Sequence, residues 1–333
     1  MRSNWLRLLP LLLSGACTVT LRRWRGFRSG PRRWGAAVVT ELLRRDIGEV
    51  VRCGPAATRA RELATPIPSP VARRVALDPA TVGGVGGLWV TPHESTTDSI
   101  RPTVLYLHGG GYCFCSSATH RLLVAQIALT ARARCLALDY ALAPEHRHPA
   151  AIDDTLAAYR ALLSEGVDPA RLVLAGDSAG GGLALATMLV LRQAGEPLPS
   201  GAALLSPWVD LTCSGESIER NAPHDYLSGE MLRFFAASYL GDADPRHPSA
   251  SPLFGDLGGL PPLLVQVGEI ETLLSEGLQL AERAAEQGVE TELQRLPGAV
   301  HVSQAFAPLM PEARPAIREI GAFIRRATTR QDG

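Results

Sequence analysis

Short apolar runs alternate with stretches of helical periodicity along most of the chain. The apolar runs occupy residues 103–107, 135–138, 172–175, 202–205 and 263–267, and residues 290–296 predict a further strand. Apolar residues recur at helical spacing at 120–133, 150–164, 181–193, 273–287 and, interrupted by prolines, 303–327. Short apolar runs bounded by turns are typical of buried strands. Because strands alternating with helices of about 10–15 residues form mainly parallel sheets covered on both faces, the pattern predicts an α/β fold.

The chain begins with a different pattern. Residues 34–51 have helical periodicity, and the sequence TPIPSP at 65–70 predicts an extended linker. Residues 71–77 and 87–91 then predict two antiparallel strands joined by the glycine-rich turn at 83–86. We therefore divide the chain into a helical N-terminal segment, residues 1–70, and a larger α/β domain, residues 71–327.

One stretch inside the larger domain breaks the alternation of strands and helices. Residues 210–250 are mostly polar, and their apolar positions predict a helix at 229–239. An insertion of this kind is suited to cover the end of the sheet as a lid or cap.

The overall charge gives no support for nucleic acid as a partner. The chain has 333 residues, of which 46% are hydrophobic, and its 33 basic residues balance 33 acidic ones. All the basic residues are arginine. A net charge of zero lacks the basic excess that binds phosphate backbones.

The N-terminus has an uneven charge. Eight arginines and no acidic residue precede Glu41. The apolar run at 8–13 is broken by Pro10 and is far shorter than the roughly 20 residues of a membrane span. Two interpretations stay open: a signal peptide or lipid attachment site, or a basic amphipathic helix that covers the active site or makes weak contact with a membrane surface. We expect a cytoplasmic protein, with secretion or membrane association as the alternatives.

The cysteines predict neither a disulfide framework nor a metal site. The chain has six cysteines, no CxxC motif and no Cys/His spacing that suits zinc. We therefore expect free thiols, no metal and no organic cofactor.

A serine motif lies between one apolar run and the next helix. The sequence GDSAG at 176–180 matches G-x-S-x-G, the strand–turn–helix nucleophile elbow. Gly176 and Gly180 leave room for a sharp turn that lifts Ser178 to the N-terminus of the helix. There the N–H of Ala179 and the helix dipole favour a developing negative charge. The alternative is an ordinary glycine-rich turn.

A nucleophilic serine needs a base and an orienting acid. In proteins with a nucleophile elbow, the acid and then the histidine follow the serine along the chain. Glu269 and Glu271 both follow the apolar run at 263–267, and either is a candidate, although either could instead be a helix N-terminal acid. His301 follows the next predicted strand in a strand-to-helix loop. The alternative for His301 is a solvated or structural residue.

A glycine-rich stretch could supply further N–H donors. Gly109, Gly110 and Gly111 directly follow the run at 103–107 and are preceded by His108. Glycine lets a backbone approach a substrate closely and adopt positive φ, as an oxyanion hole requires.

Together these motifs resemble the bacterial hormone-sensitive-lipase-like esterases of the α/β-hydrolase fold. The resemblance covers about residues 70–327 and rests on HGGGY (108–112), DYALAPEH (139–146), GDSAGGG (176–182), SPWVDLT (206–212), the stretch 251–274 and HVSQAF (301–306). It implies a central, mostly parallel eight-stranded sheet with flanking helices and a helical cap formed by the N-terminal helices and residues 210–250. Its acid motif G-x-x-E-x-L-L selects Glu271 over Glu269. The oxyanion donors it implies are Gly110, Gly111 and Ala179.

The chain departs from the family pattern at two places. Ala141 stands where DYALAPE usually has an arginine, so a charge pair that anchors the loop is missing. Residues 113–116 read CFCS where two apolar residues, glycine and serine are usual. Neither change touches the predicted triad, so both bear on substrate range.

The resemblance implies a serine carboxylesterase that acts on short- to medium-chain acyl esters. We expect roughly C2–C8 chains by analogy, with Tyr112, Trp208, Tyr226, Phe234 and Phe235 as pocket candidates. Packing in the core is the alternative for these aromatic residues. The substrate is a small ester, and a homodimer is an option. The alternatives in function are a deacetylase or lactone hydrolase, and a non-catalytic binding protein like the plant gibberellin receptor.

Overall fold

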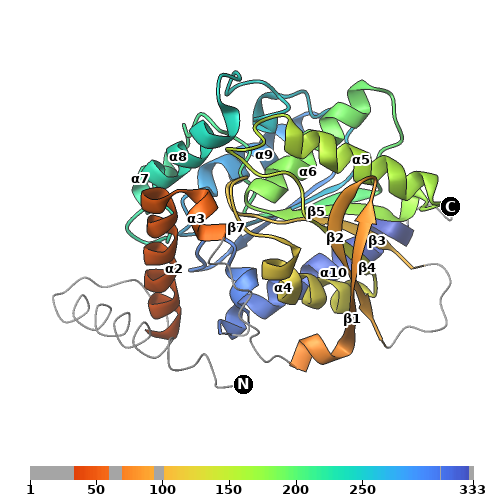
Figure 1. The fold of residues 1–333 in the computed structure, drawn as a ribbon, viewed down its shortest axis with the longest axis horizontal. Coiled ribbons are helices and arrows are strands. Elements are labelled where there is room, and N and C mark those ends of the chain that lie inside the picture. Colours follow the sequence, from red (N-terminus) through yellow and green to blue (C-terminus); the bar gives the residue numbers. More distant parts are fainter. Residues whose placement is uncertain (1–33, 60–69, 94–100, 308, 330–333) are drawn as a thin grey trace.

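The computed structural model describes residues 34–59, 70–93, 101–307 and 309–329 (Figure 1). Eight strands form one sheet in the order β1-β2-β4-β3-β5-β6-β7-β8. The β1–β2 and β2–β4 pairs are antiparallel and all the others are parallel. The strands are β1 (Val75–Val82), β2 (Val85–Pro92), β3 (Thr103–Leu107), β4 (Arg134–Leu138), β5 (Leu172–Asp177), β6 (Gly201–Leu205), β7 (Leu263–Gly268) and β8 (Thr291–Leu296).

Helices cover both faces of the sheet. Val104 and Tyr106 of β3 pack in a core with α4 and α10, whereas Leu105 and Leu107 pack in the core on the opposite face with α5, α6 and α9. Because successive strand residues point to opposite faces, β3 reads as a continuous apolar run. The main helices are α4 (Ser117–Ala131), α5 (Ala150–Ser164), α6 (Ala179–Gln193), α9 (Leu274–Glu286) and α10 (Arg314–Thr329).

The predicted α/β fold is confirmed, and the central elements lie close to their predicted positions. The edge strand β1 differs: the expected strand at 71–77 is instead a 3-10 helix, Pro70–Arg74, followed by β1. Pro79 lies inside this edge strand. Proline has no backbone N–H to donate, and an edge strand tolerates it because only one of its sides pairs with another strand. The turn to β2 is the pair Gly83-Gly84, both at positive φ, instead of 83–86. Except for Pro70, the predicted linker lies outside the described residues, as does the basic stretch 1–33.

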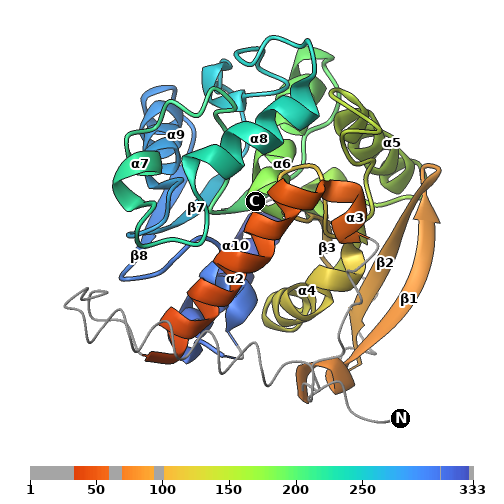
Figure 2. The ribbon, with the colours of Figure 1, turned by 60° about the vertical axis from the view of Figure 1, so that its left-hand side comes forward.

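Helices α2 (Trp34–Cys53) and α3 (Pro55–Arg59) lie over the end of the sheet where the parallel strands have their carboxyl ends. Figure 2 shows α2 beside α8 (Gly229–Leu240), and α7 (Ser217–Asn221) lies in the same layer. The predicted helix at 229–239 is thus present as α8. No helix in the described part of the chain combines the length and the apolarity needed to cross a bilayer.

Candidate active site

Ser178 lies in a strained turn between β5 and α6. Its φ is 52° and its ψ −122°, a conformation that side chains with a Cβ rarely adopt. A Cβ on Gly176 would lie 2.4 Å from the carbonyl oxygen of Gly180, and a Cβ on Gly180 would lie 2.0 Å from that of Leu107. Only glycine therefore fits at the positions two residues before and two residues after the serine. With glycine there, the main chain can turn sharply enough to present Ser178 above the strand ends.

Glu271 and His301 lie close together beneath the surface, at the same carboxyl-terminal end of the sheet. Oε1 of Glu271 lies 3.9 Å from Nδ1 of His301, and both side chains are almost completely buried. Neither of these two atoms has a hydrogen-bond partner within the described part of the chain. A small approach of the two side chains would therefore satisfy both atoms at once. Glu269, the other candidate, instead lies half-exposed, 3.5 Å from Arg295.

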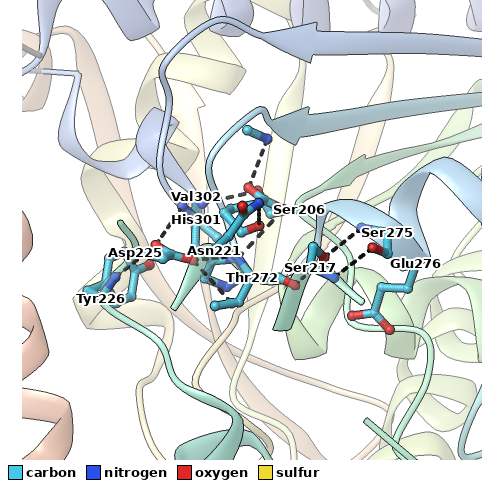
Figure 3. A network of polar contacts seen from close by, with 12 residues as sticks. Ser206, Ser217, Asn221, Asp225, Tyr226, Thr272, Ser275, Glu276, His301 and Val302 are labelled. Carbon is cyan, nitrogen blue, oxygen red and sulfur yellow. Dashed lines mark hydrogen bonds and ion pairs between the residues drawn. The ribbon is translucent and has the colours of Figure 1, made fainter. Parts of the chain in front are cut away.

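The segment that follows β6 contacts both the serine and the acid. The N–H of Trp208 donates to the carbonyl oxygen of Ser178 at 2.9 Å. Two residues earlier, the hydroxyl of Ser206 donates to Oε2 of Glu271 at 2.7 Å, and the N–H of Gly268 donates to the same oxygen at 2.9 Å (Figure 3). Ser206 also accepts from the N–H of Val302 at 3.1 Å, next to His301. These contacts bring the three loops together around one point.

The surroundings of His301 favour its protonated form. Burial alone would lower the pKa of His301, but Glu271, and after it Asp225 and Asp177, raise this pKa above its ordinary value of 6.5. The ring of Tyr226 faces the imidazole, with ring centroids 5.7 Å apart. A base surrounded by carboxylates in this way is stabilised when it takes up a proton.

The loop after β3 is hydrogen-bonded to Asp177, the residue before the serine. The N–H of Gly109 donates to Oδ1 of Asp177 at 3.0 Å, and the hydroxyl of Tyr106 donates to the same oxygen at 2.6 Å. Gly110 and Gly111 follow with φ values of 112° and 58°. No acceptor among the described residues takes the N–H groups of Gly110, Gly111 or Ala179.

Two further histidines, His108 and His120, lie next to this loop and to Asp177. His108 is buried and stacks on Tyr140, with ring centroids 4.3 Å apart. Burial, reinforced by the nearby His120, lowers the pKa of His108 to about 4. His108 is therefore neutral at neutral pH and donates from Nδ1 to the carbonyl oxygen of Gly109. Nε2 of His120 lies 3.3 Å from Oδ2 of Asp177, on the side of the carboxylate away from Tyr106.

Comparison with known proteins agrees with this geometry. The family model for the α/β-hydrolase fold matches residues 104–305, more than half of the chain. An acetyl-hydrolase of Streptomyces hygroscopicus is 45% identical over 77% of this chain and 90% of its own length. An esterase of Acinetobacter venetianus is 39% identical over 75% of this chain and 82% of its own length. The crystal structure of an esterase from the bacterial hormone-sensitive lipase family superposes with a TM-score of 0.76 at 40% identity, covering 96% of this chain and 98% of the other.

The chain belongs to the bacterial hormone-sensitive-lipase-like esterases of the α/β-hydrolase fold. This confirms the predicted family and places the protein among the carboxylic ester hydrolases. In the described part of the chain, no group of three His, Cys, Asp or Glu side chains is placed to hold a metal ion.

Some of the aromatic pocket candidates of the esterase are packed in the core, and others lie beside His301 or the loop after β3. Tyr112 and Trp208 are almost fully buried, and Tyr112 stacks on Tyr239 with ring centroids 3.8 Å apart. Tyr226 faces His301, as described above. Phe234 is half-buried and packs against Phe235, which in turn lies over the loop after β3: a Cβ on Gly111 would be 2.7 Å from the Phe235 ring. Phe235 therefore contacts the loop that carries Gly111, and Phe234 packs behind it.

The loop that lacks the family's arginine is anchored in another way. The N–H of Ala141 donates to the carboxylate of Asp154 at 2.8 Å. Arg59, at the end of α3, pairs with Glu145 and donates to the carbonyl oxygens of Cys113 and Ala143, the latter at 3.1 Å. An arginine from the N-terminal segment therefore ties this loop to the segment after HGGGY. Sequence reasoning missed this contact because Arg59 lies more than 50 residues from each partner.

Proposed function

We propose that this esterase hydrolyses short- to medium-chain acyl esters with Ser178 as nucleophile, His301 as base and Glu271 as the orienting acid. The observation that carries the proposal is the buried Glu271–His301 contact of 3.9 Å at the sheet edge where the strained turn presents Ser178. Because the segment after β6 bonds to both Ser178 and Glu271, the three groups belong to one connected site.

The reaction follows from the chemistry of these groups. His301 takes the proton of the Ser178 hydroxyl as its oxygen attacks the ester carbonyl carbon. Glu271 accepts from Nδ1–H of His301, which fixes the tautomer and stabilises the imidazolium. His301 then gives the proton to the leaving alcohol as the carbon–oxygen bond breaks. Water attacks the acyl-enzyme with His301 again as base, and this step releases the acid and restores Ser178.

The negative charge of the tetrahedral intermediate needs fixed donors. The N–H groups of Gly110, Gly111 and Ala179 have no acceptor among the described residues and are proposed to hold the oxyanion. A donor of this kind lowers the barrier by about 2.7–4 kcal/mol in comparable sites. The bond from Gly109 to Asp177 keeps the loop in register with the nucleophile turn.

We further propose that α2, α3, α7 and α8 form a cap that limits acyl-chain length. Arg44 of α2 donates to the carbonyl oxygens of residues 222, 223 and 225, so the N-terminal segment and the insertion hold each other. Phe235 of α8 lies directly over Gly111, one of the proposed oxyanion donors. A wall of aromatic side chains at that point favours chains of roughly C2–C8 by analogy.

The test is the hydrolysis of p-nitrophenyl esters from C2 to C16 by the wild type and by Ser178→Ala. We expect a maximum between C2 and C8 and loss of hydrolysis in the variant, with an unchanged unfolding temperature. Full activity of Ser178→Ala would refute the mechanism, and a preference for C16 over C4 would refute the cap argument.

A second candidate is an acetyl-hydrolase of one particular metabolite, favoured by the 45% identity to the Streptomyces protein of that name. A panel of acetyl esters, acetamides and lactones separates the two. A turnover of one acetylated class far above that of simple butyrate esters would favour the second candidate.

A further inference from the structure

Asp225 is a buried carboxylate that no sequence motif singles out. Its exposed fraction is 0%, and it accepts four hydrogen bonds (Figure 3). Oδ1 accepts from the N–H groups of Tyr226 at 2.9 Å and His301 at 3.1 Å. Oδ2 accepts from the N–H of Thr272 at 2.8 Å and from its hydroxyl at 3.1 Å. One side chain thus bridges the backbone of the proposed base and the residue that follows the proposed acid.

Neighbouring side chains of the insertion hold the same acid loop. Nδ2 of Asn221 donates to the carbonyl oxygen of Glu271 at 2.8 Å. The hydroxyl of Ser217 donates to the carbonyl oxygen of Thr272 at 2.6 Å and accepts from the N–H of Ser275 at 2.8 Å. Residues 217–226 therefore fix the acid loop at several points, and the carboxylate of Asp225 also accepts a hydrogen bond from the N–H of His301.

A carboxylate suits this position better than a neutral side chain of the same shape. All four donors to Asp225 are N–H or O–H groups, and each carboxylate oxygen accepts two of them. An amide would place its own N–H₂ against donors at one end. No arginine of the described part of the chain forms an ion pair with Asp225, so its charge stays available to His301.

We infer that Asp225 is a positioning residue of the esterase, which fixes His301 against Glu271 and contributes negative charge to the imidazolium formed during the reaction. The inference rests on the triad proposed above. It assigns to the 210–250 insertion a part in the chemistry, because an element expected only to cover the site also holds the base in place.

The N-terminal segment holds the backbone that carries Asp225. Arg44 of α2 donates to the carbonyl oxygens of Pro223 at 3.2 Å and of Asp225 itself. The contact is to the main chain and not to the carboxylate. Arg44 therefore anchors the segment without neutralising the charge that faces His301.

The test compares Asp225→Asn and Asp225→Glu with the wild type over the full pH range of ester hydrolysis. The charged or titratable groups that face His301 are Glu271, Asp225, Asp177 and, at the ring face, Tyr226. Removing the charge in Asp225→Asn should move the acid limb of kcat/KM to lower pH, because the imidazolium loses a stabilising charge. We expect kcat to fall about 10–100-fold with KM little changed, since a misplaced base costs rate and Asp225 does not reach the surface.

Asp225→Glu separates charge from position. It keeps the negative charge but displaces it by one methylene, so kcat should fall while the acid limb stays at the wild-type pH. The matched control is Asp210→Asn, which removes another buried aspartate of the insertion. Asp210 accepts from Thr212 and Ser214 and touches no residue of the triad. Its removal should leave the acid limb in place.

Unfolding at acid pH would move the apparent acid limb to higher pH, so it cannot imitate the expected shift to lower pH. An unmoved acid limb in Asp225→Asn, with kcat lowered only in proportion to the unfolded fraction, would overturn the inference. If Ser178→Ala is inactive at the same time, the proposed function stands and only the role of Asp225 falls. If Ser178→Ala is active, the triad itself is wrong.

Discussion

The hydroxyl of Ser206 donates a 2.7 Å hydrogen bond to Oε2 of Glu271 and ties the end of β6 to the acid loop after β7. Ser206 has a φ of 46°, so the chain adopts an unfavourable conformation to bring this hydroxyl to the carboxylate. The bond turns Oε1, the other oxygen of Glu271, toward His301. The geometry of the acid is thus set by a residue that directly follows a neighbouring strand.

Ser206→Ala removes this bond and should lower both activity and stability. We expect a loss of about 1.5–3 kcal/mol in the free energy of unfolding, because the variant loses a buried bond to a carboxylate and the acceptor of the Val302 N–H. Glu271 keeps its bond from Gly268. We expect kcat to fall about tenfold or more because the carboxylate gains freedom to turn away from His301. Urea unfolding and ester hydrolysis measure the two effects. Ser200→Ala, which removes the 3.1 Å bond to Leu172, is the control and should affect stability alone. Unchanged kcat in Ser206→Ala would contradict the assignment.

Gly111→Ala should disable the proposed oxyanion hole. Its new Cβ would lie 2.7 Å from the Phe235 ring at a φ of 58°. Displacing this N–H should cost about 100–1,000-fold in kcat, the usual effect of removing one oxyanion donor. Gly195→Ala is the matched control because its φ is 67° and no atom lies within 4 Å of the new Cβ. It carries the same backbone strain far from the site and should keep its kcat. Equal losses in the two variants would show that backbone strain alone explains the effect.

The pH profile should report the raised pKa of His301. The base must be neutral in the free enzyme, so kcat/KM should rise with pH through an acid limb with a midpoint above 6.5, the ordinary histidine value. The cause is the group of carboxylates led by Glu271, which stabilises the imidazolium. Glu271→Gln should therefore shift the midpoint to lower pH while kcat falls. A midpoint below 6 in the wild type would contradict this electrostatic description.

Glu276 should make stability depend on pH in the opposite way from an ordinary carboxylate. Burial, and after it the charge of Asp210, raises the pKa of Glu276 well above its usual value. Oε1 has no partner among the described residues, whereas Oε2 accepts from the N–H of Asp210 at 2.8 Å. The folded state thus keeps a proton that the unfolded state loses, and stability falls as pH rises above about 4.5, where the unfolded chain titrates.

Glu276→Gln removes this titration and keeps an oxygen for the N–H of Asp210. The free energy of unfolding of the variant, relative to the wild type, should increase between pH 5 and pH 9. Urea midpoints at the two pH values measure this difference. Glu286→Gln, on the exposed end of the same helix, is the control and should show no such trend. A constant difference for Glu276→Gln would mean that Glu276 is charged in the folded protein.

The sequence predicts the central sheet well because its strands are buried on both faces. β3 and α5 lie at their predicted residues, since helices on either side require a continuous apolar run. The prediction fails at β1, whose burial is high only at its two ends, Val75 and Val82. An edge strand with one solvated side has too few apolar positions to define its limits, and Asp78 and Pro79 obscure the pattern further.

The residues of the candidate site also fall into those that a local sequence pattern predicts and those that it does not. The proposed triad of Ser178, Glu271 and His301 could be predicted because each residue lies in a short motif after a strand. Asp225 and Arg59 have no such local signal. Asp225 reaches Thr272 and His301 across 47 and 76 residues, and Arg59 reaches Ala143 across 84. Contacts of this kind depend on how the insertion and the N-terminal helices fold over the sheet, which periodicity does not encode.

The most direct test of the central claim is to locate the covalent bond that the enzyme forms. The protein is incubated with an activated alkyl phosphonate, which a nucleophilic serine attacks to give a stable adduct, and the labelled peptide is identified by mass spectrometry. We predict one phosphonyl group per chain, attached to Ser178, and a far slower reaction in His301→Ala. A label on another residue, or an equal rate in the His301 variant, would contradict the proposed nucleophile and base.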